Sequence, residues 1–215
     1  LLNFHPLVMT AWGSDILILP EQSRIFKVAT IASLKRADLI TCDGENVRFR
    51  MMTMGIDNSK IKMILHGVDT SEFNMSRGIR SKIPTIISIR NLKKIYNVES
   101  LIRAVPFVLE EHPEAHFIIG GEGKQVGELI KLASSLKIMP SITFTSTIDH
   151  ALLPEYLASA DIYVSTSLSD GGISISTLEA MACGCASIAT DTGDIKDWIQ
   201  DGYNGCIVAQ NNPFA

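Results

Sequence analysis

The chain has 215 residues, of which 46% are hydrophobic and 20% are charged, and its formal net charge is −4. This length and composition allow one large globular domain or two modest ones, each with a packed core. The acidic balance gives no reason to expect nucleic acid as a partner. No apolar run reaches the roughly 18 residues that a membrane span needs, and no signal-peptide pattern is present. We therefore expect a cytoplasmic protein.

Short β-branched runs alternate with longer amphipathic stretches, which is typical of parallel α/β folds. In the first third of the chain we expect buried strands at 6–11, 38–43 and 61–67, with helices at 23–37 and 45–55 between them. The following stretch is polar, contains Gly78 and closes with Pro84. We therefore predict an interdomain linker at 75–84.

A second alternation follows the linker. It predicts strands at 85–90, 116–121, 142–146, 161–167, 185–190 and 204–209. Helices are expected between them at 97–112, 124–137, 150–160, 175–183 and 194–200. Because βαβ crossovers are right-handed and place helices on both faces, this pattern predicts a doubly wound parallel sheet. Such sheets bind ligands at the carboxyl ends of their strands.

One such strand end leads into the segment "LSDGGISISTLEAMACG". Gly171 and Gly172 precede the helix, so the backbone N–H groups at its N-terminus can approach an anion such as a phosphate. Ile175, Leu178 and Ala182 are predicted to form the packing stripe of this helix, and Glu179 lies off that stripe. A carboxylate in this position can accept hydrogen bonds from the sugar hydroxyls of a nucleotide. The alternative is a solvated glutamate after an ordinary glycine loop.

The cysteines and histidines show no pattern of a metal or redox site. Cys183 and Cys185 flank a glycine, Cys42 and Cys206 lie elsewhere, and no C-x-x-C pair is present. We expect free core thiols in a reduced protein. The five histidines have no metal-ligand spacing, so we predict neither a metal nor a cofactor.

Several motifs together resemble a known family. They are "SIRNLKKIYNVESLIRA", "HFIIGGEG", "LLPEYLASADIYVSTSLSDGG", "EAMACG" and "DIKDWIQDGYNGCIV", preceded by "HPLVMTAWGSDI" and "KIKMILHGVDTSEF". In this order and spacing they resemble the family 4 retaining glycosyltransferases of GT-B fold, also called glycosyl transferases group 1. The resemblance covers nearly the whole chain and implies two Rossmann-like domains with doubly wound parallel sheets.

The resemblance also implies an arrangement of domains. Residues 1–74 correspond to the later part of the N-terminal, acceptor-side domain, and 85–215 to the C-terminal, donor-binding domain without its last helices. We therefore expect an internal fragment that is inactive by itself.

The implied function is transfer of a sugar from a nucleotide-diphosphate donor, of UDP or GDP type, with retention and without an obligatory metal. The acceptor would be a carbohydrate or lipid-linked glycan, as in the synthesis of cell-surface polysaccharide. By resemblance, Arg90 binds the diphosphate and Glu179 binds the donor ribose. The remaining donor contacts would come from Gly121 and from the loop residues Asp170, Gly171, Gly172, Ile173, Ser174 and Ile175.

Two positions depart from the family pattern. Gly171 stands where the family has a glutamate that contacts the donor sugar, so Asp170 or backbone amides would have to supply that contact. The family lysine, expected five residues after the arginine and followed by glycine, falls at Ile95, and we predict Lys94 as its substitute. These departures keep two alternatives open, a non-catalytic sugar-nucleotide-binding module and a nucleotide-sugar epimerase.

Several residues outside the donor motifs have two alternative predicted roles. Trp12, Gly13 and Asp15 follow a strand, where they could contact the acceptor or simply form a turn. His66 is predicted to be structural or to line the cleft. Basic and apolar residues mix in the helices expected at 23–37 and 45–55, which would suit peripheral contact with an anionic membrane surface. We favour the alternative of a core stripe with a solvated opposite face.

Overall fold

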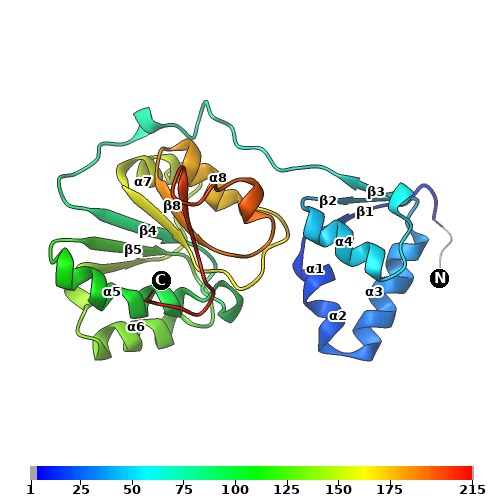
Figure 1. Ribbon diagram of the computed structural model, residues 1–215, viewed down its shortest axis with the longest axis horizontal. Helices are drawn as coiled ribbons and strands as arrows, with labels where there is room; N and C mark the ends of the chain where they lie inside the picture. The colour runs from blue at the N-terminus through cyan, green and yellow to red at the C-terminus, as the bar shows by residue number, and fades with distance from the viewer. Residues whose placement is uncertain (1–3, 215) are drawn as a thin grey trace. The chain divides into compact units, whose positions relative to one another are not determined.

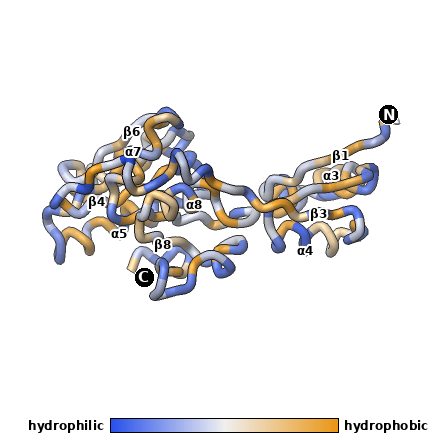
Figure 2. Tube along the Cα trace, turned by 90° about the horizontal axis from the view of Figure 1, so that it is seen from above, coloured by the Kyte–Doolittle hydropathy of each residue, from blue (hydrophilic) through white to orange (hydrophobic). Residues whose placement is uncertain are grey.

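The computed structural model describes residues 4–214, and their contacts divide the chain into two compact units (Figure 1). Unit 1 contains the residues up to His66 together with Ser169–Ser174 and Gly193–Ile195. Unit 2 contains Gly67–Leu168, Ile175–Thr192 and the residues from Lys196 onward. Hydrophobic and hydrophilic stretches alternate along the trace of both units (Figure 2), as expected for elements with one buried face.

Unit 1 contains a three-stranded parallel sheet in the order β1-β2-β3. Its strands are β1 (Val8–Ala11), β2 (Leu39–Cys42) and β3 (Ile61–Met63). The connections contain α1 (Ser14–Leu17), α2 (Leu19–Gln22), α3 (Arg24–Arg36) and α4 (Glu45–Thr53). The connections from β1 to β2 and from β2 to β3 run in the same direction across the sheet. Because such connections are right-handed, α3 and α4 lie on the same face of the sheet (Figure 1). Ile40 of β2 and Met51 of α4 are both fully buried in the core of unit 1.

Unit 2 contains a six-stranded parallel sheet in the order β6-β5-β4-β7-β8-β9. Its strands are β4 (Thr85–Ile89), β5 (His116–Gly120), β6 (Ile142–Thr145), β7 (Ile162–Ser165), β8 (Ala186–Thr190) and β9 (Gly205–Val208). The chain moves outward from β4 to β6 and then returns to β7 beside β4. The strand order therefore reverses between β4 and β7, which is the point where doubly wound sheets bind ligands.

Helices cover both faces of this sheet. They are α5 (Val98–Glu111), α6 (Val126–Ser135), α7 (Leu153–Ser159) and α8 (Ile175–Ala182). Ile86 packs in one core with residues of α5 and α6. Its neighbour Ile87 packs in another core with residues of α7 and α8 (Figure 1). Successive strand residues thus point to opposite cores, as a sheet covered on both faces requires.

The predicted fold class is confirmed, since both units are α/β with parallel sheets, and each of the nine predicted strands is present with trimmed ends. The helix predicted at 194–200 is wrong, because this segment forms only a 3₁₀ turn at Ile195–Asp197. Four further 3₁₀ turns occur at Asn58–Lys60, Met75–Arg77, Lys94–Tyr96 and Met139–Ser141. Within residues 4–214 no helix is long and apolar enough to cross a membrane.

Candidate functional site

The reversal point of unit 2 brings together the residues that follow β4 and β7. Arg90 directly follows β4, and its N–H donates to the carbonyl oxygen of Gly120 at 3.1 Å. Ser167 lies two residues beyond β7, the strand that pairs with β4. Because carboxyl ends of neighbouring parallel strands lie at one edge of the sheet, both side chains reach the same place.

The guanidinium of Arg90 is held by side chains from three further segments. Its Nη2 donates to Ser167 Oγ at 2.9 Å, and its Nη1 lies 3.4 Å from Ser176 Oγ in the first turn of α8. The ring of Tyr96 faces the guanidinium, with 4.3 Å between Cζ and the ring centroid. Tyr163, fully buried, donates its hydroxyl to Ser176 Oγ at 2.8 Å. Two hydroxyls and a cation–π contact therefore fix a positive charge at the strand ends.

A glycine loop after β5 lies directly against the backbone of Arg90. Gly121 has φ +127°, and a Cβ there would lie 2.2 Å from the Arg90 carbonyl oxygen. A Cβ on Gly123 would lie 2.1 Å from the carbonyl oxygen of Leu92. The Leu92 N–H also donates to the carbonyl oxygen of Glu122 at 2.8 Å. The glycines allow the two loops to pack closely, so Gly121 positions Arg90 through its backbone.

Glu179 is buried within α8, with only 8% of its surface exposed. The predicted packing stripe of this helix is wrong, because Ile175 is 42% exposed while Thr177, Glu179 and Ala180 are buried. The physical reason is that α8 packs against three elements, β7, β8 and α7. Its buried surface is therefore wider than one apolar stripe and includes polar residues.

Burial raises the pKa of Glu179, because a charged carboxylate is poorly solvated there. His150 opposes this rise, with its Nε2 3.7 Å from Glu179 Oε1. The histidine ring also meets the edge of Phe73, with 5.5 Å between ring centroids. The exposed imidazole of His150 therefore lies beside the buried carboxylate of Glu179.

The comparison with known proteins decides the family. Residues 69–215 match the family described as Glycosyl transferases group 1. The chain belongs to this family. Residues 1–44 additionally match the family described as Glycosyl transferase 4-like.

Two curated relatives and one solved structure show how this glycosyltransferase-family chain compares. It is 31% identical over 141 residues to an uncharacterized glycosyltransferase of Methanocaldococcus jannaschii, covering 63% of this chain and 35% of that protein. It is 29% identical over 131 residues to the GDP-mannose-dependent alpha-(1-6)-phosphatidylinositol monomannoside mannosyltransferase of Mycolicibacterium smegmatis, covering 58% and 34%. The chain thus matches about a third of the length of each relative.

The structure of Anabaena HepE in complex with UDP-glucose superposes on the chain with a TM-score of 0.83. The two are 20% identical, and the match covers 97% of this chain and 59% of HepE. This similarity supports the GT-B fold that the sequence motifs imply.

The loop between β4 and α5 differs from the expected family spacing. Lys94, predicted as the phosphate contact, is exposed, and Tyr96 is the residue of this loop found against Arg90. Asn97 has the left-handed backbone that favours glycine, with φ 47°. It lies seven residues after Arg90, one residue beyond the position at which the family pattern has a glycine. The sequence motif does not reveal Tyr96, because its contact with Arg90 depends on the conformation of the loop before α5.

The donor-loop residues predicted from the resemblance lie in two places. Asp170, Gly171, Gly172, Ile173 and Ser174 group by contact with unit 1, whereas Ile175 begins α8 in unit 2. Gly172 and Ile173 are buried, and the other three loop residues are half-buried. Their contact with a donor stays a prediction.

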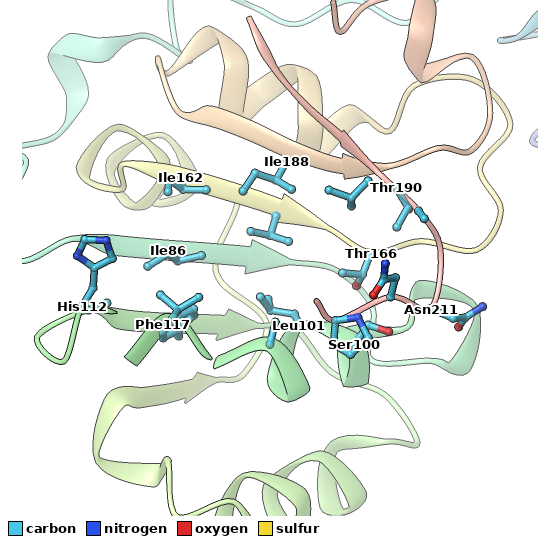
Figure 3. A pocket seen from close by; sticks show the side chains of 18 of the residues that line it. Ile86, Ser100, Leu101, His112, Phe117, Ile162, Thr166, Ile188, Thr190 and Asn211 are labelled. Carbon is cyan, nitrogen blue, oxygen red and sulfur yellow. The ribbon is translucent and has the colours of Figure 1, made fainter. Parts of the chain in front are cut away.

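An apolar pocket of about 290 Å³ lies elsewhere in unit 2, on the face of the sheet that bears α5 (Figure 3). Ile86, Ile162 and Ile188 project into it from neighbouring strands, facing Leu101 of α5. Its lining is mainly aliphatic, with His112 at one end. A diphosphate needs fixed positive charge and hydrogen-bond donors, so the site at Arg90 suits a nucleotide better than this apolar cavity.

The four cysteines differ in burial. Cys42, Cys183 and Cys185 are buried free thiols as predicted, whereas Cys206 is exposed, which corrects the expectation of a core thiol there. Burial raises the pKa of Cys183 to about 11 and that of Cys185 to about 12. Within the part of the chain that the structure describes, no cluster of three or more His, Cys, Asp or Glu residues could hold a metal.

Proposed function

We propose that the chain is part of a retaining glycosyltransferase that moves a sugar from a nucleotide-diphosphate donor to a glycan or lipid-linked acceptor. The observation that carries this proposal is the Arg90 guanidinium, fixed at the reversal point of a doubly wound sheet by Ser167, Ser176 and Tyr96. Family membership supports the reaction class. A donor of UDP or GDP type is supported by a relative named as GDP-mannose-dependent and by the HepE structure, which was solved in complex with UDP-glucose.

Arg90 stabilises the departing diphosphate in this proposal. The leaving group gains negative charge in the transition state, and a preorganised guanidinium can stabilise that charge through bidentate hydrogen bonds. Ser167 and Ser176 orient its nitrogens, and Tyr96 keeps its plane in place. Lys94 is exposed near the start of the same loop and stays a second candidate for the phosphate contact.

Glu179 binds the ribose hydroxyls of the donor in this proposal. A buried carboxylate can hold two hydroxyl donors strongly, because water does not compete for its oxygens. His150 favours the ionised form that accepts both hydrogen bonds. The backbone amides of 170–175 and Gly121 stay predicted donor contacts.

Gly171 supports an alternative, a sugar-nucleotide-binding module without catalysis. It stands where the family glutamate would contact the donor sugar. Donor binding without transfer by a full-length parent would favour this alternative over the enzyme.

A cytoplasmic location and peripheral membrane contact belong to the same proposal. Helix α3 contains four basic residues and no acidic one, and Ile25 and Val28 are 79% and 66% exposed. This combination is typical of helices that rest on anionic lipid. Leu34 of α3 is buried in the core, and Ile31 packs against the same core.

Calorimetric titration of UDP, GDP and ADP into the chain tests the proposed donor site. We expect micromolar binding of one nucleotide, weakened about 100-fold by Arg90→Ala, since a charge-assisted bidentate contact is lost. Glu179→Gln should also weaken binding by on the order of tenfold, because a neutral amide accepts ribose hydrogen bonds less strongly.

Matched controls come from an exposed ion pair on α5. Both side chains are exposed, and Glu99 Oε1 lies 2.7 Å from Arg103 Nη2. Arg103→Ala and Glu99→Gln therefore make the same chemical changes outside the proposed site and should leave the affinity unchanged. Equal binding by wild type and Arg90→Ala, in a folded sample, would contradict the proposal.

A further inference from the structure

The buried carboxylate of Glu179 is in ion-pair contact with a histidine from another segment of unit 2. Its Oε1 lies 3.7 Å from Nε2 of His150, which precedes α7. The two side chains differ in burial, since 69% of the His150 side chain but only 11% of the Glu179 side chain is exposed. The contact therefore joins a solvent-exposed imidazole to a carboxylate that solvent hardly reaches.

The position of His150 is fixed through both its backbone and its ring. It stands in the turn before α7, where Asp149 Oδ1 accepts the N–H of Ala151 at 3.0 Å and the Asp149 carbonyl oxygen accepts that of Leu152 at 2.9 Å. Its ring meets the edge of Phe73, with 5.5 Å between ring centroids and 77° between the planes. Phe73 is only 3% exposed and packs in a core with residues of α7 and α8. A buried ring thus holds the exposed imidazole beside Glu179.

The other charged groups around His150 are all exposed. His150 lines a pocket of about 530 Å³ together with charged residues from the segment that enters the linker, from its own turn and from α7. They are Glu72, Arg77, Asp149 and Glu155. Solvent screens these exposed charges, whereas the Glu179 carboxylate is buried. The interaction of His150 with Glu179 is therefore the least screened one.

The contact with His150 acts on Glu179 in two ways. An ion pair at Oε1 restricts the rotation of the carboxylate, so its remaining lone pairs keep fixed directions. Burial raises the pKa of Glu179, and His150 opposes this rise through its charge and through hydrogen bonding. Only the ionised carboxylate offers both oxygens as acceptors. His150 thus favours the form and the orientation that can hold two neighbouring hydroxyl groups.

We propose that His150 is a positioning residue of the donor site, through which Glu179 distinguishes a ribose from a deoxyribose. A ribonucleotide carries neighbouring hydroxyls at C2′ and C3′, and a carboxylate in a fixed orientation can accept hydrogen bonds from both. A nucleotide without these hydroxyls gains nothing from that orientation. The inference rests on the proposed function, because it assigns the source of ribose recognition within the same site.

Calorimetric titration of the chain with a nucleoside diphosphate and with its 2′,3′-dideoxy analogue tests this inference. The base is the one that binds best among uracil, guanine and adenine. We expect wild type to bind the ribonucleotide at least about tenfold more tightly, because the analogue lacks both hydroxyls. His150→Ala should weaken ribonucleotide binding about fivefold, the effect of one ordinary hydrogen bond, and leave the affinity for the analogue unchanged. His150→Gln keeps an N–H donor and should retain most of the affinity at pH 7.

A double variant shows whether His150 acts through Glu179. Once Glu179→Gln has removed the carboxylate, adding His150→Ala should change the ribonucleotide affinity by less than about twofold. Losses of affinity that simply add would mean that the two residues act independently.

The pH dependence of ribonucleotide affinity gives a second reading. Wild-type affinity should fall on acidification where Glu179 takes up a proton, since the ionised form accepts both hydrogen bonds. In His150→Ala the fall should occur at higher pH, because the opposing effect on the pKa of Glu179 is lost. His112→Ala is the matched control, because His112 Nδ1 lies 4.0 Å from Glu114 Oε1 in an exposed pair. It should change neither the affinity nor its pH profile.

Two results would overturn the inference. One is equal weakening of the ribonucleotide and of its dideoxy analogue by His150→Ala, which would mean that the imidazole supports the fold or contacts another part of the nucleotide. The other is additive loss in the double variant. A ribose preference that Glu179→Gln abolishes and His150→Ala leaves intact refutes this inference alone. A folded wild type that binds no nucleotide, or shows no ribose preference, refutes the proposed role of Glu179 as well.

Discussion

Replacing Gly121 by alanine should strongly destabilise unit 2, because two costs coincide at this residue. Its φ of +127° lies in a region that only glycine adopts freely, which costs about 1–3 kcal/mol for another residue. The new Cβ would also lie 2.2 Å from the Arg90 carbonyl oxygen, and relieving such overpacking costs a further 1–3 kcal/mol, roughly. The expected loss is about 4 kcal/mol, a large fraction of the roughly 5–15 kcal/mol of a typical domain.

Alanine substitutions at two other glycines of unit 2 separate the backbone cost from the overpacking cost. Gly202 has φ +75° but open space around a Cβ, so Gly202→Ala should cost about 1 kcal/mol from the backbone alone. Gly127 lies within α6 with open space and no left-handed backbone, so Gly127→Ala should stabilise by about 0.5 kcal/mol. From most to least stable, the predicted order is therefore Gly127→Ala, wild type, Gly202→Ala and Gly121→Ala.

Urea unfolding measures this order through the fluorescence of Trp198, which lies in unit 2. A Trp12→Phe background removes the signal of unit 1. The midpoint shifts at constant slope then give the differences in unfolding free energy. If Gly121→Ala unfolds at the same urea concentration as Gly202→Ala, the close packing of the two loops around Arg90 is not as described.

Two further predictions concern ionisable groups that differ in burial. At pH 8 a thiol reagent should modify Cys206 in the folded protein well before the other cysteines, which are buried, and fast modification of a second thiol would contradict the assigned burial. Glu179→Gln should raise the free energy of unfolding at pH 7 by about 1 kcal/mol, since the variant removes a poorly solvated charge. Because the folded-state pKa of Glu179 lies above its ordinary value of 4.5, wild-type stability falls as pH rises through that value, so the gain should vanish below about pH 4. A gain that is independent of pH would refute burial as its cause.

The strands were predictable from the sequence because each is a short β-branched run between turn residues. The doubly wound, parallel character of the six-stranded sheet was predicted from the alternation of strands and helices, whereas its strand order was not. The segment 194–200 was not predictable in the same way, since its apolar residues have helical spacing but only Ile195–Asp197 form a turn. Local periodicity does not reveal when a segment is too short to form a helix against its neighbours.

The charged residues of the candidate site were predictable from the sequence, whereas the contacts around them were not. Arg90 and Glu179 follow from motif positions, but the burial of Glu179 depends on contacts of α8 with three other elements. Tyr96 lies six residues after Arg90, and its stacking depends on a loop whose left-handed residue is Asn97. Such contacts arise from tertiary packing, which the residue types alone do not specify.

The most direct test of the donor site compares the affinity of a nucleoside diphosphate with that of its monophosphate. The base is the one that binds best in the nucleotide titration, and the proteins are wild type, Arg90→Ala and Arg103→Ala. The account predicts that the diphosphate binds wild type and Arg103→Ala at least about tenfold more tightly than the monophosphate, and that this advantage disappears in Arg90→Ala. An advantage of the same size in Arg90→Ala would contradict the placement of the diphosphate at Arg90.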